Sequence, residues 1–170
     1  MKVGILGGSF NPPHAGHIHI SKLALKKLGL NQVWWVVAKQ NPLKENQEKS
    51  YQKRLNLCAE ILQKDRRILV KKCDEIYSYK LLENLQKKFP QIKFFWIMGG
   101  DNLENLHKWK NYRAFIKNAK IAIFSREKTL MNIQKMPAWN FLKNYQPKIF
   151  WSENLNISST KIRNEELHNR

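Results

Sequence analysis

Two histidines, His14 and His17, are the residues of this chain whose types and spacing point most directly to chemistry. They close the segment GGSFNPPHAGH, and the amphipathic pattern that follows predicts a helix over residues 16–28. The histidines therefore fall at the amino end of that helix, where free N–H groups and the helix dipole favour an anion. Two imidazoles there could donate hydrogen bonds to phosphate oxygens. The plainer alternative is that one of them only caps the turn.

The loop in front of the histidines has the composition of a turn that handles phosphate. The apolar run at residues 3–6 predicts a buried strand that leads into Gly7 and Gly8, which lack a Cβ and can take unusual φ values or let a ligand approach the backbone. Pro12 and Pro13 stiffen the loop and prevent a helix before the first histidine. A glycine pair after a strand is weak support by itself, so the hypothesis depends on strand, turn and spaced histidines together.

A zinc site is not the expected use of these side chains. His14, His17 and His19 have no cysteine or carboxylate close by in sequence. Two ligands on one helical turn do not make a tetrahedral site.

The rest of the chain alternates between strand and helix patterns. Helical spacing appears in residues 55–62 and 81–89, with a proline directly after the second. Further apolar runs predict buried strands at residues 33–38, 68–70, 94–98, 121–124 and 149–151. This alternation predicts an α/β fold, a Rossmann-like parallel sheet with helices on both faces. Segments 39–50 and 127–147 are polar, lysine-rich and weakly periodic, and we expect them to be loops.

Two other segments follow predicted strands and are expected at the same sheet edge as the histidines. Gly99, Gly100 and Asp101 come after the fourth strand, and ISSTKIR (157–163) comes after the last. Ligands of such sheets bind beyond the carboxyl ends of the strands. Hydroxyls and unpaired N–H groups at a helix start, with the forked cation of Arg163, suit a triphosphate. Taken alone, however, a serine and threonine cluster is more often an ordinary helix cap.

The composition favours one soluble domain with a strong positive charge. A length of 170 residues suits a single domain over residues 1–170, and the formal charge of +18 attracts polyanions, whether nucleic acid or small phosphate-rich substrates. The lysines are spread along the chain, so a dedicated nucleic-acid surface is not expected. No apolar stretch approaches the roughly 20 residues of a membrane span, and the amino terminus lacks a signal-peptide pattern. Cys58 and Cys73 have no pairing motif, which favours free, buried thiols in the cytoplasm.

Three segments together resemble a known family. GGSFNPPHAGH, FFWIMGGDNLENLHKW and ISSTKIR are similar to signatures of nicotinate mononucleotide adenylyltransferases, within the nucleotidyltransferases of the HxGH type. The resemblance implies attack of a mononucleotide phosphate on the α-phosphorus of ATP in NAD biosynthesis, with pyrophosphate leaving and Mg²⁺ bound with ATP. No metal cage made by the protein is expected. The implied catalytic residues are His14, His17 and Arg163. The implied ATP-binding residues are Gly7, Gly8, Ser9, Phe10, Asn11, Gly16, Gly99, Asp101, Ser158, Ser159, Thr160 and Arg163.

The acceptor site is implied by looser matches. Trp109 is expected to stack on the pyridine ring, while Tyr77 and Ser78 are expected to contact its carboxylate. Lys80 stands where the family has an acid, which favours nicotinate over nicotinamide. Lys44 and Arg54 match basic positions of the family and are also expected to bind the mononucleotide. Two departures stand nearby: Leu43 replaces a frequent histidine, and Arg126 lacks the Pro-Gly that often follows it.

Two alternatives stay open at this point. A transferase of the same fold could use nicotinamide mononucleotide or phosphopantetheine, and would not need Trp109. A protein of another class could use the fold to sense nucleotides or bind RNA without catalysis, in which case binding would survive loss of His17 and fall steeply with salt. A homo-oligomer is also left open by the sequence.

Overall fold

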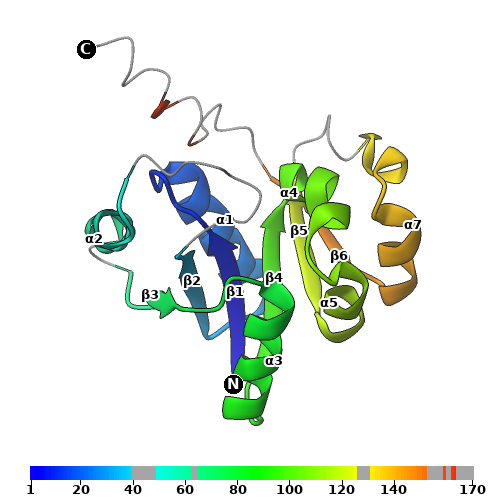
Figure 1. The fold of residues 1–170 in the computed structure, drawn as a ribbon, viewed down its shortest axis with the longest axis horizontal. Helices are drawn as coiled ribbons and strands as arrows, with labels where there is room; N and C mark the ends of the chain where they lie inside the picture. Colours follow the sequence, from blue (N-terminus) through cyan, green and yellow to red (C-terminus); the bar gives the residue numbers. More distant parts are fainter. Residues whose placement is uncertain (40–48, 63–64, 126–130, 153–158, 160–161, 164–170) are drawn as a thin grey trace.

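The computed structural model describes residues 1–39, 49–62, 65–125, 131–152, 159 and 162–163 (Figure 1). The described residues form a six-stranded sheet in the order β3-β2-β1-β4-β5-β6, and all neighbouring strands are parallel. The strands are β1 (Lys2–Gly8), β2 (Gln32–Ala38), β3 (Ile68–Cys73), β4 (Lys93–Gly99), β5 (Ile121–Ser125) and β6 (Lys148–Trp151). Each one covers an apolar run that predicted it. The expected Rossmann-like α/β architecture is confirmed.

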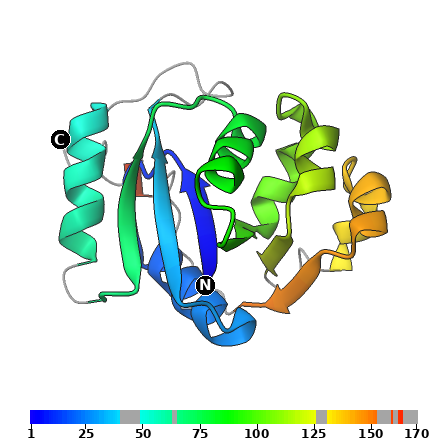
Figure 2. The same cartoon turned by 90° about the horizontal axis from the view of Figure 1, so that it is seen from below.

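Helices cover both faces of this sheet. One face packs against α1 (Ala15–Leu28) and α2 (Tyr51–Ile61), and the other against α3, α4, α5 and α7. Their bounds are α3 (Ser78–Lys88), α4 (Gly100–Asn105), α5 (Tyr112–Asn118) and α7 (Trp139–Leu142), with short 3₁₀ turns η1 (Leu106–Lys108), η2 (Ile133–Lys135) and η3 (Lys143–Tyr145). Figure 2 shows α1 in blue and α3 in green on opposite sides of the sheet.

The central strands are apolar throughout because both of their faces are buried. In β2, Trp34 and Val36 belong to the core under α3, while Val33, Trp35 and Val37 belong to the core under α1 and α2. Successive side chains of a strand point to opposite faces, so each central strand must supply two cores. This explains why continuous apolar runs, rather than alternating ones, marked these strands in the sequence.

Helix α1 begins and ends close to where the sequence placed it. It starts at Ala15 and is closed by Gly29, whose left-handed backbone has φ 59°. The N–H of Leu30 donates to the carbonyl of Leu25 at 3.1 Å, as in a helix end capped by glycine. The predicted end of this helix is therefore confirmed.

The segment 127–147 does not match the expected loop in its described part. Residues 131–147 contain η2, α7 and η3, and the side chains of Ile133, Met136 and Leu142 are buried in the core under α5. These turns are too short to produce an amphipathic pattern, yet single apolar residues three or more positions apart anchor each of them to the sheet. The other expected loop, 39–50, lies mostly outside the described residues.

The sheet topology places a crevice beside β1. The chain order reverses between β1 and β4, which are neighbours and end at Gly8 and Gly99. Ligands of doubly wound sheets bind in the crevice outside the carboxyl ends of the strands at such a point. Among the helices of the described ranges, none has the length and apolarity that a bilayer crossing requires. Cys58 and Cys73 are free and buried, as expected.

Candidate active site

The loop that leaves β1 contains one strained residue, Phe10. Its backbone lies in the left-handed region with φ 47°, which costs a bulky residue about 1–3 kcal/mol. Its buried ring stacks on Trp35 at 4.9 Å and lies 4.8 Å from the ring of His17, and this packing offsets the strain. The expectation that Gly7 and Gly8 supply the unusual φ values is therefore wrong, since both belong to β1 and neither has a positive φ.

Gly7 is required for close packing and not for an unusual backbone conformation. A Cβ at this position would lie 3.1 Å from Cζ2 of Trp96, so the missing side chain leaves room for that indole. Gly7 also lines the cavity described below.

The two histidines cap helix α1 as a reciprocal pair. His14 is the N-cap residue, and its Nδ1 accepts a hydrogen bond from the N–H of Gly16 at 3.1 Å. His17, three positions later, accepts the N–H of His14 with its own Nδ1 at 3.2 Å. The ring centroids lie 3.9 Å apart. The two imidazoles thus occupy the positions of a capping box, which fixes their orientation at the amino end of the helix.

This capping arrangement also determines which nitrogen bears the proton. Because both Nδ1 atoms accept backbone N–H groups, the neutral rings of His14 and His17 carry hydrogen on Nε2. The capping alternative and the anion-binding hypothesis are therefore compatible: one nitrogen caps the helix and the other remains a donor.

Burial keeps both rings neutral. Desolvation by burial and, second, the neighbouring ring of His14 lower the pKa of His17 to about 3, although a hydrogen bond with the His14 backbone partly opposes the shift. Desolvation also lowers the pKa of His14, partly offset by the nearby carboxylate of Asp101. At neutral pH the pair therefore offers two Nε2–H donors without a net charge.

A hydrogen-bond relay holds the helix start against the sheet. The Ser21 hydroxyl donates to the carbonyl of His17 at 2.8 Å and accepts the indole N–H of Trp35 at 2.8 Å. Ser21 is fully buried, so this polar contact depends on both partners. Through the hydroxyl of Ser21, the backbone of His17 is connected to Trp35 of β2.

The second predicted cluster reaches the same loop from the far end of the chain. The hydroxyl of Ser159 donates to the carbonyl of Pro12 at 2.8 Å, and Nη1 of Arg163 donates to the carbonyl of Asn11 at 2.5 Å. These contacts bring Ser159 and Arg163 to the loop that leads into His14. Ser158 and Thr160, also predicted to bind ATP, lie outside the described residues.

Asp101 lies at the start of α4, directly after β4. A Cβ at Gly99 would be 2.5 Å from Oδ1 of Asp101, so glycine at that position leaves room for the carboxylate. Its carboxylate raises the pKa of His14, so Asp101 lies close enough to act on that ring electrostatically. Three loops from the ends of β1, β4 and β6 therefore meet at one edge of the sheet.

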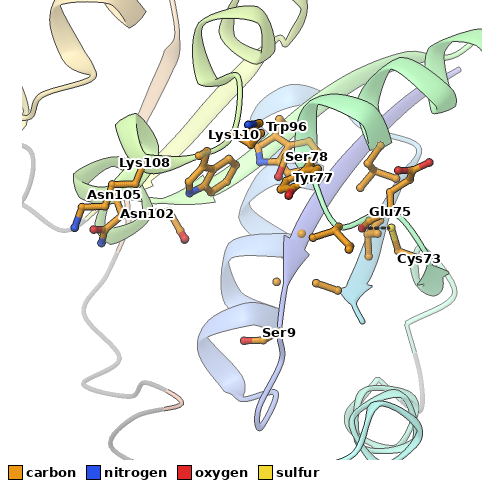
Figure 3. Close-up of a pocket in the computed structure, with 17 residues that line it drawn as sticks. Ser9, Cys73, Glu75, Tyr77, Ser78, Trp96, Asn102, Asn105, Lys108 and Lys110 are labelled. Atoms are coloured by element: carbon orange, nitrogen blue, oxygen red, sulfur yellow. Dashed lines mark hydrogen bonds between the residues drawn. The ribbon is translucent and has the colours of Figure 1, made fainter. Parts of the chain in front are cut away.

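A cavity of about 730 Å³ opens between these loops and α3. Gly7, Gly8 and Ser9 line it from β1, Tyr77 and Ser78 from the start of α3, and Trp109 from the end of η1. Figure 3 shows Asn102, Asn105 and Lys108 on one side and Cys73 and Glu75 on the opposite side. Its volume is in the range of a small-molecule site. The predicted acceptor residues Tyr77, Ser78 and Trp109 thus share one cavity.

Two lysines that the sequence analysis did not select flank Trp109. Lys108 and Lys110 both line the cavity, whereas Lys80 is exposed and is not among the described residues around it. Among the described residues that line the cavity, Lys108 and Lys110 are the cations available to an anionic acceptor. The local signal was present in the sequence as the tetrapeptide HKWK, in which a lysine stands on each side of the tryptophan.

Lys44 and Arg54 are the other two residues predicted to bind the mononucleotide. Lys44 lies outside the described residues. Arg54 is 1% exposed and directs its guanidinium at backbone carbonyls of the neighbouring loops. Its guanidinium is thus engaged by the protein backbone, and its contact with the mononucleotide stays a prediction.

The described residues contain no cluster of three or more His, Cys, Asp or Glu side chains with the geometry to hold a metal ion. Among the acidic residues that the structure describes, Asp101 acts electrostatically on His14. This donor set fits a divalent cation that takes most of its ligands from phosphate oxygens and water, as Mg²⁺ commonly does.

Comparison with known proteins gives concordant results. Residues 5–165 match the model of the cytidylyltransferase-like family. A probable nicotinate-nucleotide adenylyltransferase of Ruegeria sp. (strain TM1040) is 43% identical over 129 residues, which cover 74% of this chain and 68% of that protein. A protein of the same description from Parvibaculum lavamentivorans is 39% identical over 147 residues, covering 84% and 73%.

The fold is shared with solved structures. Nicotinic acid mononucleotide adenylyltransferase of Plasmodium falciparum, complexed with NaAD, superposes with a TM-score of 0.76 over 96% of this chain and 82% of the other, at 17% identity. A structure of the same protein complexed with APC gives a TM-score of 0.73. At this level of identity the likeness concerns the fold.

The low pKa of His17 predicts a loss of stability in acid. An unfolded histidine titrates near 6.5 and folded His17 near 3, so the unfolded state binds the extra proton between these values. The stabilisation is complete above pH 6.5 and declines as the pH falls toward 3. Between pH 7 and pH 5 this single group should remove about 2 kcal/mol from the free energy of unfolding.

Urea unfolding of the wild type and of His17→Gln at both pH values measures this effect. Glutamine at this capping position can still accept the His14 N–H, so the comparison reports the titration rather than the cap. The variant should lose about 2 kcal/mol less than the wild type on acidification. Equal losses would show that the pKa of His17 is not depressed.

Proposed function

The chain belongs to the cytidylyltransferase-like family, and on that basis we propose that it is a nicotinate-nucleotide adenylyltransferase. The reaction transfers AMP from ATP to nicotinate mononucleotide and yields nicotinate adenine dinucleotide and pyrophosphate, a step of NAD biosynthesis. The observation that carries the proposal is the convergence of the histidine pair, Ser159 and Arg163 on one loop beside a cavity that contains Trp109.

The donors of the loop suit a transfer without a covalent enzyme intermediate. A phosphate oxygen of the acceptor forms a bond to the α-phosphorus, while the bond from that phosphorus to the β-phosphate bridging oxygen breaks and its electron pair leaves with pyrophosphate. His14 and His17 donate their Nε2–H groups to phosphate oxygens on which charge accumulates, and Arg163 adds a permanent cation. Since the rings are held by their Nδ1 atoms, no reorientation is needed during the reaction.

We propose Mg²⁺ as the metal that accompanies ATP. When bound with the triphosphate, it would supply positive charge that offsets the charge of the phosphates and of the leaving pyrophosphate. Asp101, whose carboxylate acts electrostatically on His14, would contribute to holding the metal, directly or through water.

The other end of the cavity suits a pyridine ring with a carboxylate. Trp109 offers an aromatic face, and α3 begins at Ser78 without a side-chain cap, so backbone N–H groups of its first turn are available to an anion. Lys108 and Lys110 also line the cavity and add positive charge. These donors favour nicotinate over the uncharged nicotinamide. Lys44 remains a proposed contact of the mononucleotide, and the free, buried thiols support a cytoplasmic location.

An assay with both acceptors tests the proposed specificity. Purified protein with ATP and magnesium should form a dinucleotide and pyrophosphate faster with nicotinate mononucleotide than with nicotinamide mononucleotide, because only the first offers a carboxylate to the donors of the cavity. Chromatography of the products measures both rates. Equal or greater turnover with nicotinamide mononucleotide would contradict the specificity, and turnover with phosphopantetheine alone would contradict the proposed acceptor class.

His17→Ala should abolish most of the turnover while ATP still binds. Removing one preorganised donor costs on the order of a hundredfold in kcat, whereas other contacts of the triphosphate remain. Single-turnover rates and titration calorimetry with ATP measure the two effects. His19→Ala, two residues along the same helix, is the control and should retain wild-type turnover. A protein that binds RNA and shows no transfer in either form would favour the non-catalytic alternative.

Trp109→Ala should raise the KM of the acceptor far more than that of ATP. An aromatic face stacked on a ring contributes about 1–3 kcal/mol, which corresponds to about tenfold or more in KM. Steady-state kinetics with each substrate varied in turn separate the two values. An unchanged acceptor KM would place the pyridine ring elsewhere.

A further inference from the structure

Arg54 is a buried cation without an acidic partner. It lies in the second turn of α2 and is 1% exposed. No carboxylate of the described residues pairs with its guanidinium, although a buried charge normally requires one. An arginine keeps its proton even when burial lowers its pKa, so the positive charge is permanent.

The guanidinium binds four backbone carbonyls that belong to three different segments. Nη1 donates to Ser9 at 2.7 Å and to Ala38 at 2.8 Å, Nη2 donates to Lys39 at 2.9 Å, and Nε donates to Lys49 at 3.3 Å. Ser9 directly follows β1, Ala38 and Lys39 stand at the end of β2, and Lys49 precedes α2. One side chain therefore ties the exits of two adjacent strands together.

These carbonyls lie where they would otherwise oppose an anionic ligand. Ser9 and Ala38 both line the cavity, and Ser9 is followed by the strained residue Phe10. A phosphate group has acceptors but few donors to offer a carbonyl at neutral pH. By donating hydrogen bonds to these oxygens, Arg54 offsets their partial negative charge at the edge of the site. Its guanidinium also places a fixed positive charge behind that edge.

The guanidinium is itself held in place. It lies over the ring of Tyr51, 5.4 Å from the centroid. The hydroxyl of Tyr51 in turn accepts the N–H of Cys73 at 2.9 Å, which connects α2 to the end of β3. A lysine could not reproduce this arrangement, because its three donors are on one atom and cannot reach four separated carbonyls in a plane.

We propose that Arg54 is a positioning residue for adenylyl transfer, which sets the distance between the loop carrying the histidine pair and the end of β2. This inference rests on the proposed function of the site. It differs from direct binding of the mononucleotide, because a positioning role affects the transition state more than the binding of the acceptor.

The test compares Arg54→Lys and Arg54→Met with Leu55→Ala. Leu55 is buried on the same helix, and its apolar side chain cannot donate to the carbonyl of Ser9, so its loss lowers stability without removing the hydrogen bonds of Arg54. At a temperature where all variants are folded, both Arg54 variants should lose kcat by about tenfold to a hundredfold with the acceptor KM changed by less than about threefold. Leu55→Ala should keep kcat within about twofold of the wild type.

Several outcomes would overturn the proposal. A rise in the acceptor KM at unchanged kcat would mean direct contact with the mononucleotide. Equal losses of kcat in Leu55→Ala and the Arg54 variants would mean a general effect of stability. Wild-type kcat in Arg54→Lys would mean that charge alone suffices, and should Arg54→Met not fold, Arg54→Lys decides the question. Arg67→Met removes an exposed arginine and controls for the change in net charge.

Hydrogen exchange provides a readout that does not depend on activity. The backbone N–H groups of residues 14–17 should exchange faster in both Arg54 variants than in the wild type, and should be unchanged in Leu55→Ala. If the wild type shows no transfer, the proposed function fails. Hydrogen exchange then still tests whether Arg54 holds the loop in place. If transfer occurs and exchange is unchanged in the Arg54 variants, only the positioning role fails.

Discussion

The loop between β1 and α1 depends on side chains for the hydrogen bonds that its own backbone does not make. Among the described residues, the carbonyls of Ser9, Asn11 and Pro12 accept from Arg54, Arg163 and Ser159. A buried carbonyl without a donor would cost about 1–3 kcal/mol. Two distant parts of the chain, helix α2 and the segment of Ser159 and Arg163, must therefore assemble on this loop before it has a single shape. The histidine pair follows directly on it, so the placement of both rings depends on the same assembly.

In this site, one nitrogen of each imidazole caps the helix, and the other is available to donate to an anion. Each imidazole uses one nitrogen to complete the helix and keeps the other as a donor, and burial prevents either ring from becoming a cation. The permanent positive charge comes from arginine and lysine side chains around the loop and the cavity. Neutral, preorganised donors strengthen as charge develops on a phosphate and need no proton transfer to act. The strong positive charge of the chain would attract the phosphate-rich substrates of the proposed reaction.

The acceptor end of the site is prepared by aromatic packing. The ring of Trp109 lies 6.3 Å from Trp96 and 5.6 Å from Phe115, and Gly7 leaves the space that Trp96 occupies. The tryptophan proposed to stack on the pyridine ring is therefore held by the core under α5 before any ligand binds. Little side-chain entropy would be lost on binding, which favours affinity. The point where the sheet order reverses brings this cluster beside the loop of β1.

The sequence by itself determined the strands, the long helices and the placement of the histidines, because continuous apolar runs and the capping of α1 involve only near neighbours in the chain. It did not reveal the strain at Phe10, the short helices within residues 131–147, the lysines that line the cavity or the partners of Arg54. The bonds from Arg54 to Ser9 and from Arg163 to Asn11 span 45 and 152 positions. Contacts of that separation have no local pattern, since they exist only after the strands pair and the helices pack. The residue types of the site could be identified from the sequence, and the packing of the sheet decided what each of them touches.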